Sequence, residues 1–431
     1  MPVSLNTADA DFARQFDAFL AARREEEADV SQTVAQIIAD VRARGNAAVA
    51  ELTRRFDEID VAAAGMRVTD AEIATAMAEV APETMDALKL ARDRIEAFHH
   101  RRQLPSDDRY TDEQGAELGY KWTAVDSAGL YVPGGQAAYP SSVLMNAVPA
   151  KVAGVPRVAM VVPTPGGVMN PLVFAAARLA GVDEVYRIGG AQAVAALAFG
   201  TETVEPVAKI VGPGNAYVAE AKRQVFGVVG IDSIAGPSEV LIVADKDNRA
   251  DWIAADLLAQ AEHDAAAQSI LITDDGELAE AVVREVDKQL ATLPRGNIAG
   301  ASWERFGAII KVERLDQAPD LVNRLAPEHL ELATADPEAL LSGIRNAGAV
   351  FLGHYTPEAV GDYVAGPNHV LPTSRTARFS SGLSVLDFMK RSSILRLNAD
   401  ALRALGPAAM RIADAEGLDA HARSIEMRLN R

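Results

Sequence analysis

Short apolar strands alternate with helices between residues 157 and 226, and this alternation constrains the fold more than any other feature of the sequence. Runs rich in β-branched residues at 157–162, 184–188 and 209–211 each precede a segment with helical spacing of apolar residues. Three such units in succession are typical of a parallel sheet, because a helix must carry the chain back across the sheet between parallel strands. The sequence therefore predicts a Rossmann-like α/β domain here.

Each of these strands ends in a loop that contains glycine, at 165–167, 189–192 and 212–215. Ligands of such sheets gather at the carboxyl ends of the strands, where glycine lets the backbone approach and helix N-termini favour anions. None of the loops is a G-x-G-x-x-G fingerprint, and no suitably spaced acidic residue follows to bind a ribose. The sequence therefore favours neither interpretation of these glycines, as parts of dinucleotide-binding loops or as ordinary turn residues.

A second alternation of strands and helices begins near residue 239. It predicts a second, larger α/β domain with an incomplete Rossmann-like parallel sheet, preceded by a helical N-terminal region and followed by helices from Val385 and Asp400 onward. The expected strands of this second domain are 240–243, 269–273, 307–312, 329–333 and 348–352. The expected N-terminal helices are 9–24, 30–44, 47–56 and 70–99.

Composition excludes several classes of function. The 431 residues are 49% hydrophobic, enough for two to four domains at roughly 100–200 residues each. A net charge of −18 without a basic block opposes nucleic-acid binding, and no apolar run of about 18 residues indicates a signal peptide or membrane span, so we expect a cytoplasmic protein. The chain has no cysteine, which excludes disulfides, thiolate metal sites and a thiohemiacetal route for oxidising an aldehyde.

Gln260 and His263 stand three residues apart near the end of an expected helix, so they project from one face. An imidazole beside an amide oxygen is a plausible half of a metal site that prefers nitrogen and oxygen ligands. Taken alone, the pair is better explained as a helix C-terminus at which His263 interacts with the last carbonyls. Five of the seven histidines lie in the last 169 residues, which points to that part of the chain for the chemistry.

Seven specific motifs follow one another along the chain. They are GLYVPGG at 129–135, YPSSVLMN at 139–146, VGPGN at 211–215, AGPSE at 235–239, QAEHD at 260–264, APEHL at 326–330, and the stretch from Gly361-Asp-Tyr to His369-Val-Leu-Pro-Thr373. In this order they resemble the motifs of the histidinol dehydrogenase family. The resemblance covers nearly the whole chain and is strongest from Gly129 to Ser384.

The resemblance implies a set of functional residues. It places the ligands of one Zn²⁺ per subunit, which also contact substrate, on Gln260, His263, Asp362 and His421. Further substrate contacts fall on Ser238, His329, His369 and Glu416, the catalytic pair on Glu328 and His329, and NAD⁺ contacts on Tyr131, Gln192 and Asn215. Each position has an ordinary structural alternative, such as a turn carboxylate for Asp362, a surface histidine for His421 or a helix start after Pro327.

The implied reaction is the oxidation of L-histidinol to L-histidine through the aldehyde, the last step of histidine biosynthesis, with two NAD⁺ consumed per turnover. His329 would take the alcohol proton, because an imidazole titrates near neutral pH. With no cysteine available, Glu328 would activate water to hydrate the aldehyde. The metal would hold the substrate rather than activate water.

The resemblance also implies the domain organisation and the assembly. We expect an N-terminal helical segment at 1–26 and a larger α/β domain, with the metal and catalytic residues, built from 27–130 and 239–382. The NAD-binding domain is expected at 131–238. A helical tail at 383–431 is expected to complete the active site of the partner subunit in a homodimer.

Two other functions remain open from the residues. A related NAD-dependent alcohol dehydrogenase, resembling sulfopropanediol dehydrogenase, would share the metal and catalytic positions, but an anionic substrate should need an arginine or lysine anchor, whereas Glu416 suits an ammonium group. A metal-dependent binding protein without catalytic activity would have no need of Glu328 and His329.

Overall fold

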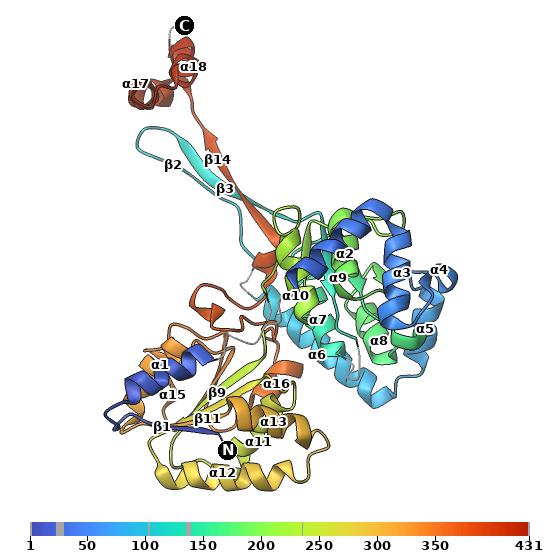
Figure 1. Ribbon diagram of the computed structural model, residues 1–431. Coiled ribbons are helices and arrows are strands. Elements are labelled where there is room, and N and C mark those ends of the chain that lie inside the picture. Colours follow the sequence, from blue (N-terminus) through green and yellow to red (C-terminus); the bar gives the residue numbers. More distant parts are fainter. Residues whose placement is uncertain (1, 23–29, 102–103, 135–138, 235, 430–431) are drawn as a thin grey trace.

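The computed structural model describes residues 2–22, 30–101, 104–134, 139–234 and 236–429. Gly135 and Ala235 of the family motifs and residues 23–26 of the predicted N-terminal segment lie outside the described residues. The chain forms two α/β bodies, each built on a parallel sheet, and an arm that projects from them (Figure 1). No described helix combines the length and the apolar character needed to cross a membrane.

The first body contains a five-stranded sheet in which every pair of neighbours is parallel. Its strands, in spatial order, are β6 (Glu184–Tyr186), β5 (Arg157–Val161), β4 (Ser127–Tyr131), β7 (Lys209–Val211) and β8 (Gly230–Ile231). The crossing helices are α7 (Pro140–Val152), α8 (Pro171–Leu179), α9 (Gly190–Phe199) and α10 (Ala216–Val225). The predicted Rossmann-like parallel sheet is confirmed.

Helices from the N-terminal part of the chain cover both faces of this five-stranded sheet. They are α2 (Ser31–Arg44), α3 (Asn46–Asp57), α4 (Val61–Ala64), α5 (Asp70–Ala78) and α6 (Pro82–His100). Val34 and Val49 share one core with α9, and Ile73 and Ile95 share the other core with α7 and α8. The helix expected over 70–99 is two helices, because Pro82 lacks the amide hydrogen that a continuous helix requires and starts α6 instead.

This packing differs from the expected division of the chain. Residues 27–130 were expected to belong with 239–382, whereas their helices pack on the five-stranded sheet and β4 is its central strand. The reason is physical: the apolar faces of these helices meet the faces of the nearest sheet, which the sequence pattern does not identify. We propose to draw the first body from about residue 30 to about residue 232, apart from residues 108–124, which belong to the arm.

The second body contains a six-stranded sheet, also parallel throughout, which confirms the second predicted α/β domain. Its strands, in spatial order, are β1 (Val3–Asn6), β11 (Ala308–Lys311), β10 (Gln268–Thr273), β9 (Glu239–Ala244), β12 (His329–Ala333) and β13 (Ala349–Leu352). One face packs against α11 (Ala250–Ala261), α12 (Gly276–Leu290) and α13 (Gly296–Phe306). The other packs against α1 (Phe12–Ala22), α14 (Ala318–Leu325) and α15 (Pro337–Leu341).

The arm is an antiparallel sheet of β2 (Asp108–Thr111), β3 (Glu117–Ala124) and β14 (Met389–Arg396), which carries α17 (Ala399–Ala415) and α18 (Asp419–Leu429) at its tip (Figure 1). The helix expected from Val385 is wrong, because this segment is one 3₁₀ turn (Val385–Phe388) followed by β14. On the arm, the Arg391 guanidinium lies 4.6 Å from the Tyr120 ring and 5.9 Å from the Trp122 ring. These cation–π contacts stiffen the cross-strand pairing.

Candidate active site

The candidate active site lies at the amino edge of the six-stranded sheet. Glu239 begins β9 and His329 begins β12, and the two strands are neighbours in register, with His329 opposite Val240. Helix α11 runs back across the sheet from the end of β9, so its C-terminal end brings Gln260 to this same edge. Open α/β sheets usually bind ligands at the opposite edge, the carboxyl ends of the strands.

Glu239 and Glu328 are joined by reciprocal hydrogen bonds. The Glu239 amide donates to Glu328 Oε2 at 2.9 Å, and the Glu328 amide donates to Glu239 Oε2 at 3.3 Å. The amide of Ser374 donates to the other oxygen of Glu239 at 3.0 Å. These bonds fix the start of both strands and the orientation of the Glu328 carboxylate.

The His329 ring is oriented by the backbone of the neighbouring strand. Its Nδ1 lies 3.1 Å from the carbonyl oxygen of Glu239, and because a carbonyl only accepts, Nδ1 carries the hydrogen. Nε2 faces Asp362 Oδ1 at 3.5 Å. The ring therefore presents Nε2 to the site as the nitrogen that can exchange a proton.

Helix α16 (Glu358–Tyr363) brings two carboxylates to the same ring. Glu358 Oε1 lies 3.5 Å from His329 Nδ1, and Asp362, one turn later, faces Nε2. The start of this helix is held by a bond of 2.7 Å from the Glu358 amide to Glu331 Oε1 on β12. His369 Nδ1 lies 2.9 Å from the Asp362 carbonyl oxygen, so the following loop is fixed to the helix.

The buried acids shift one another's proton affinity. Burial raises the pKa of Glu328 to about 7 and that of Glu358 to about 8, and burial together with the charge of Asp256 raises the pKa of Glu331 well above its usual range. Burial acts to lower the pKa of His329, but the carboxylates of Glu358, Glu328 and Asp362 together raise it well above its usual value. The edge is therefore strongly acidic and suited to a cation.

Several polar atoms at this edge have no hydrogen-bond partner among the described residues. They include Gln260 Oε1, Asp362 Oδ1, Glu358 Oε2 and His329 Nε2. One ligand atom each from His329, Glu358 and Asp362 lies within 4.8 Å of the others. Unpaired buried groups are costly without a ligand, and the oxygens of Gln260 and Asp362 fit a metal ion that prefers nitrogen and oxygen ligands, which leaves His329 Nε2 to exchange a proton.

The structure gathers most of the predicted metal, substrate and catalytic residues but leaves two of them apart. His263, directly after α11, lies close enough to Asp362 for their charges to interact, and Ser238 directly precedes β9. Glu416 and His421 are exposed and belong to α17, α18 and their junction at the tip of the arm, far from α11 and α16 within the chain (Figure 1). These two residues are not part of the amino edge of their own chain.

The residues expected to contact NAD⁺ lie on the other sheet, at the carboxyl edge. Tyr131 ends β4, Gln192 is in the first turn of α9, and Asn215 caps α10 by accepting bonds from the amides of Tyr217 and Val218. The Tyr131 hydroxyl accepts a bond of 2.9 Å from the Gly190 amide, and burial raises the pKa of Tyr131 to about 12. The three residues thus lie at or just beyond the carboxyl ends of β4, β6 and β7, at one edge of the sheet.

The sequence interpretation did not identify Glu239, Glu331 and Glu358. All three are buried at 3% or 4% exposure. A charged residue within the otherwise apolar run 329–333, and the spacing of four between Glu358 and Asp362, were signals that could have found two of them.

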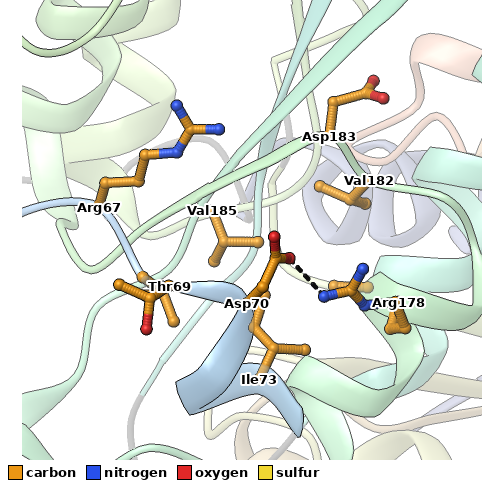
Figure 2. Close-up of a pocket in the computed structure, with 10 residues that line it drawn as sticks. Arg67, Thr69, Asp70, Ile73, Arg178, Val182, Asp183 and Val185 are labelled. Carbon is orange, nitrogen blue, oxygen red and sulfur yellow. Dashed lines mark hydrogen bonds and ion pairs between the residues drawn. The ribbon is translucent and has the colours of Figure 1, made fainter.

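A separate hollow of about 260 Å³ lies between α5 and α8 in the first body (Figure 2). Figure 2 shows the Arg178 side chain directed at Asp70, with 2.5 Å between the charged atoms. Arg67 and Asp183 also line this hollow. None of the predicted site residues lines this hollow, since they lie at the edges of the two sheets.

The chain is similar to known proteins over its whole length. The family model of histidinol dehydrogenase matches residues 20–429. The histidinol dehydrogenase of Rhizobium meliloti (strain 1021) is 66% identical over 430 residues, covering 100% of this chain and 99% of the relative, and that of Nitrobacter winogradskyi is 67% identical with 100% of both covered. A crystal structure of histidinol dehydrogenase from Elizabethkingia anophelis superimposes with a TM-score of 0.94 at 34% identity, covering 100% of this chain and 98% of that one. Motifs, fold and relatives agree over the whole length, and the chain belongs to the histidinol dehydrogenase family of oxidoreductases.

Proposed function

We propose that the protein oxidises L-histidinol to L-histidine through L-histidinaldehyde, reducing two NAD⁺ per turnover, as the last step of histidine biosynthesis. The observation that carries this proposal is the convergence of His329 Nε2, the Glu328 carboxylate and unpaired ligand oxygens at one sheet edge, in a chain of this family. The acidic edge also suits a substrate with an ammonium group.

The proposed metal is one Zn²⁺ per subunit, held by Gln260, His263, Asp362 and the His421 of a second chain. Gln260 Oε1 and Asp362 Oδ1 are buried and unpaired within the described residues, which supports their role as ligands. When bound, the ion supplies a Lewis acid that holds nitrogen atoms of the substrate. A cation beside Asp362 also offsets the negative charge that raises the His329 pKa.

In the first half-reaction His329 takes the proton from the substrate hydroxyl on Nε2. The bond from Nδ1 to the Glu239 carbonyl keeps the ring in the required tautomer. Tyr131, Gln192 and Asn215 would hold NAD⁺ at the carboxyl edge of the five-stranded sheet, where it would supply the hydride acceptor for each half-reaction. Ser238 and His369 are proposed to position the substrate beside this base.

In the second half-reaction Glu328 removes a proton from water as the water adds to the aldehyde. With no cysteine in the chain, the resulting gem-diol is the species that loses the second hydride. A pKa of about 7 suits this carboxylate as a general base at neutral pH. The reciprocal bonds with Glu239 hold it in place.

The proposed assembly is a homodimer in which the arm of each chain completes the other chain's site. Glu416 and His421 are exposed at the arm tip, away from the amino edge of their own chain. In the partner's site, Glu416 would bind the substrate ammonium and His421 the metal. Both residues would then act in the second chain.

The experiment that tests the function counts NADH formed per histidinol by the purified protein. We expect two equivalents, loss of turnover after exhaustive removal of metal, and recovery on addition of zinc, with unchanged circular dichroism throughout. One equivalent, or full turnover by metal-free protein, contradicts the proposal.

The shared site is tested by mixing two inactive variants, His329→Asn and His421→Asn, after unfolding and refolding them together. In a mixed dimer, the chain with an intact His329 receives an intact His421 from its partner. Random pairing gives one working site in half of the dimers, so about a quarter of the wild-type activity should return. Each variant refolded alone is the control, and an inactive mixture contradicts a shared site.

A further inference from the structure

Asp57 precedes the alternation of strands and helices in the sequence, yet it lies at the edge of the five-stranded sheet where the strands end. Asp57 is the last residue of α3, which packs against α9 and against the 3₁₀ turn Pro165–Gly167 that follows β5. Two residues later, Ile59 Cδ1 lies 3.7 Å from the position that a Cβ would take on Gly167. The end of α3 is therefore next to the glycine loops of this edge.

Three polar atoms around these loops have no partner within the described part of the chain. They are Asp57 Oδ2, Thr164 Oγ1 and Gln192 Nε2. Thr164 is 2% exposed and Gln192 is 1% exposed. Buried polar groups without partners are uncommon because each loses its hydrogen bonds to water, so three at one edge indicate a polar ligand.

Asp57 belongs to the same site as the residues proposed to contact NAD⁺. Its charge acts on the Tyr131 hydroxyl, which accepts a bond from the Gly190 amide at 2.9 Å. Gln192 is so close to this turn that a Cβ on Gly190 would lie 2.6 Å from its Oε1. Burial raises the pKa of Asp57 to about 6, so the group is still mostly ionised at neutral pH.

The position of Asp57 indicates which half of a dinucleotide would lie beside it. Helices α3 and α4 lie on the outer side of the first body, away from α11 and α16, where the chemistry takes place (Figure 1). A dinucleotide whose reactive ring points toward that chemistry places its adenosine half toward α3. The ligand groups near Asp57 are then the hydroxyls of the adenosine ribose.

We propose that Asp57 accepts hydrogen bonds from the ribose hydroxyls of the adenosine half of NAD⁺ and sets the preference for NAD⁺ over NADP⁺. In a Rossmann fingerprint an acidic residue within the alternation does this work. Here α3 supplies the carboxylate instead. A 2′-phosphate at this place would meet a like charge. The cations of the same turn, Arg54 and Arg55, are exposed, and Arg55 lies 5.2 Å from the Phe56 ring.

The first test uses the unmodified protein and two fragments that lack the reactive ring. Calorimetry compares the binding of ADP-ribose with that of ADP-ribose carrying a 2′-phosphate. Hydrogen bonds to a charged group contribute about 1.5–3 kcal/mol, so ADP-ribose should bind roughly ten- to a hundred-fold more tightly. Equal binding, or tighter binding of the phosphorylated fragment, overturns the proposal.

The second test replaces Asp57→Asn, which keeps the size of the side chain and removes its charge. ADP-ribose should bind at least about tenfold more weakly, and the discrimination between the fragments should fall to a few-fold. The matched control is Glu58→Gln, which removes one charge from the exposed neighbouring residue and should leave both affinities unchanged. An Asp57→Asn protein with wild-type discrimination overturns the proposal, and thermal melting confirms that both variants are folded.

This inference rests on the proposed function, but the two fail differently. A protein that binds ADP-ribose selectively through Asp57 and does not oxidise histidinol contradicts the function and retains the nucleotide site. A protein that oxidises histidinol and treats both fragments alike contradicts the role of Asp57 alone. If Asp57→Asn does not fold, the comparison of fragments on the unmodified protein decides.

Discussion

The two parallel sheets have the same architecture but carry the side chains of the two proposed sites on opposite edges. At the carboxyl edge of the five-stranded sheet, the proposed site is made of glycine loops, helix starts and few charges. At the amino edge of the six-stranded sheet, it is made of carboxylates and an imidazole on the first residues of β9 and β12. A fold of this kind can therefore carry a ligand site at either edge, and we infer that the charge of the ligand determines which edge suits it.

The difference has a physical cause. Glycine at the carboxyl edge lets the backbone of two loops come close together, as at Gly212, where φ is 112° and a Cβ would lie 2.2 Å from the Tyr131 carbonyl oxygen. Backbone amides and helix starts favour anions such as phosphates. Buried acids at the amino edge favour cations.

The largest expected effect comes from His329→Asn at the amino edge. Asparagine can still donate to the Glu239 carbonyl but cannot take up a proton, so both half-reactions should slow by roughly 10²–10⁴-fold. Stopped-flow measurement of NADH formation from histidinol and from histidinaldehyde checks this. His354→Asn, at a histidine paired with Asp245 at 3.2 Å beyond the other end of the sheet, is the control and should leave both rates unchanged. Wild-type rates of NADH formation in the His329→Asn variant would show that another residue is the base.

Glu328→Gln should separate the two half-reactions. Glutamine keeps an oxygen to accept the bond from the Glu239 amide but loses the base, so aldehyde oxidation should fall by roughly 10²–10⁴-fold and the first hydride transfer much less. The same stopped-flow comparison measures both steps. Equal losses in the two steps contradict the assignment of water activation to Glu328.

Lys222→Met tests the carboxyl edge. Lys222 is 2% exposed, pairs with Asp232, whose side chain is 5% exposed, and donates to the Gly212 carbonyl at 2.9 Å. Asp232 accepts from the Gly212 amide at 2.7 Å. Removing one partner leaves an uncompensated buried charge, so the free energy of unfolding should fall by about 3–5 kcal/mol. Denaturant unfolding measures this.

The same variant should weaken NADH binding while the KM for histidinol changes little, because the loop at Gly212 belongs only to the nucleotide edge. The control is Arg223→Met, since the Arg223 side chain is 57% exposed and pairs with Glu220 on the same helix. A surface pair of this kind contributes at most about 1 kcal/mol. If Lys222→Met raises the KM for histidinol as much as the KM for NAD⁺, the two edges are not independent.

The smallest expected effect is on the pH profile. Burial raises the Glu328 pKa to about 7, and the base form exists only above that value, so aldehyde oxidation should rise about tenfold per pH unit below pH 7 and level off above it. The profile of Glu328→Gln should lack this inflection. An inflection near the ordinary carboxyl pKa of 4.5 instead contradicts the role of burial.

Most strands of the two parallel sheets could be predicted, because glycine loops and segments with helical spacing separate their apolar runs. The arm could not, since β14 reads MKRSSILR and neither of its faces is buried in the chain, so no alternation indicates a strand. The packing of α2–α6 and the edge strand β1 also depend on contacts that no local pattern records.

The candidate site divides in the same way. Gln260, His263, Glu328, His329 and Asp362 lie in motifs and were predicted, although their gathering at an amino edge was not. Glu239, Glu331 and Glu358 come from three separate elements that bury them together, and burial raises the pKa of Glu331 and of Glu358. Their roles could not be predicted because burial is a property of the fold.

The Trp122 ring beside Arg391 gives the arm an optical signature. The chain has three tryptophans: Trp122 on β3 of the arm, Trp252 on α11 and the buried Trp303 on α13. The body that holds the five-stranded sheet has none between residues 127 and 232. Replacing Trp252 and Trp303 by phenylalanine would leave a single emitter on the arm. The wavelength and polarisation of its emission would then report whether the arm leaves water in the proposed dimer, without any added label.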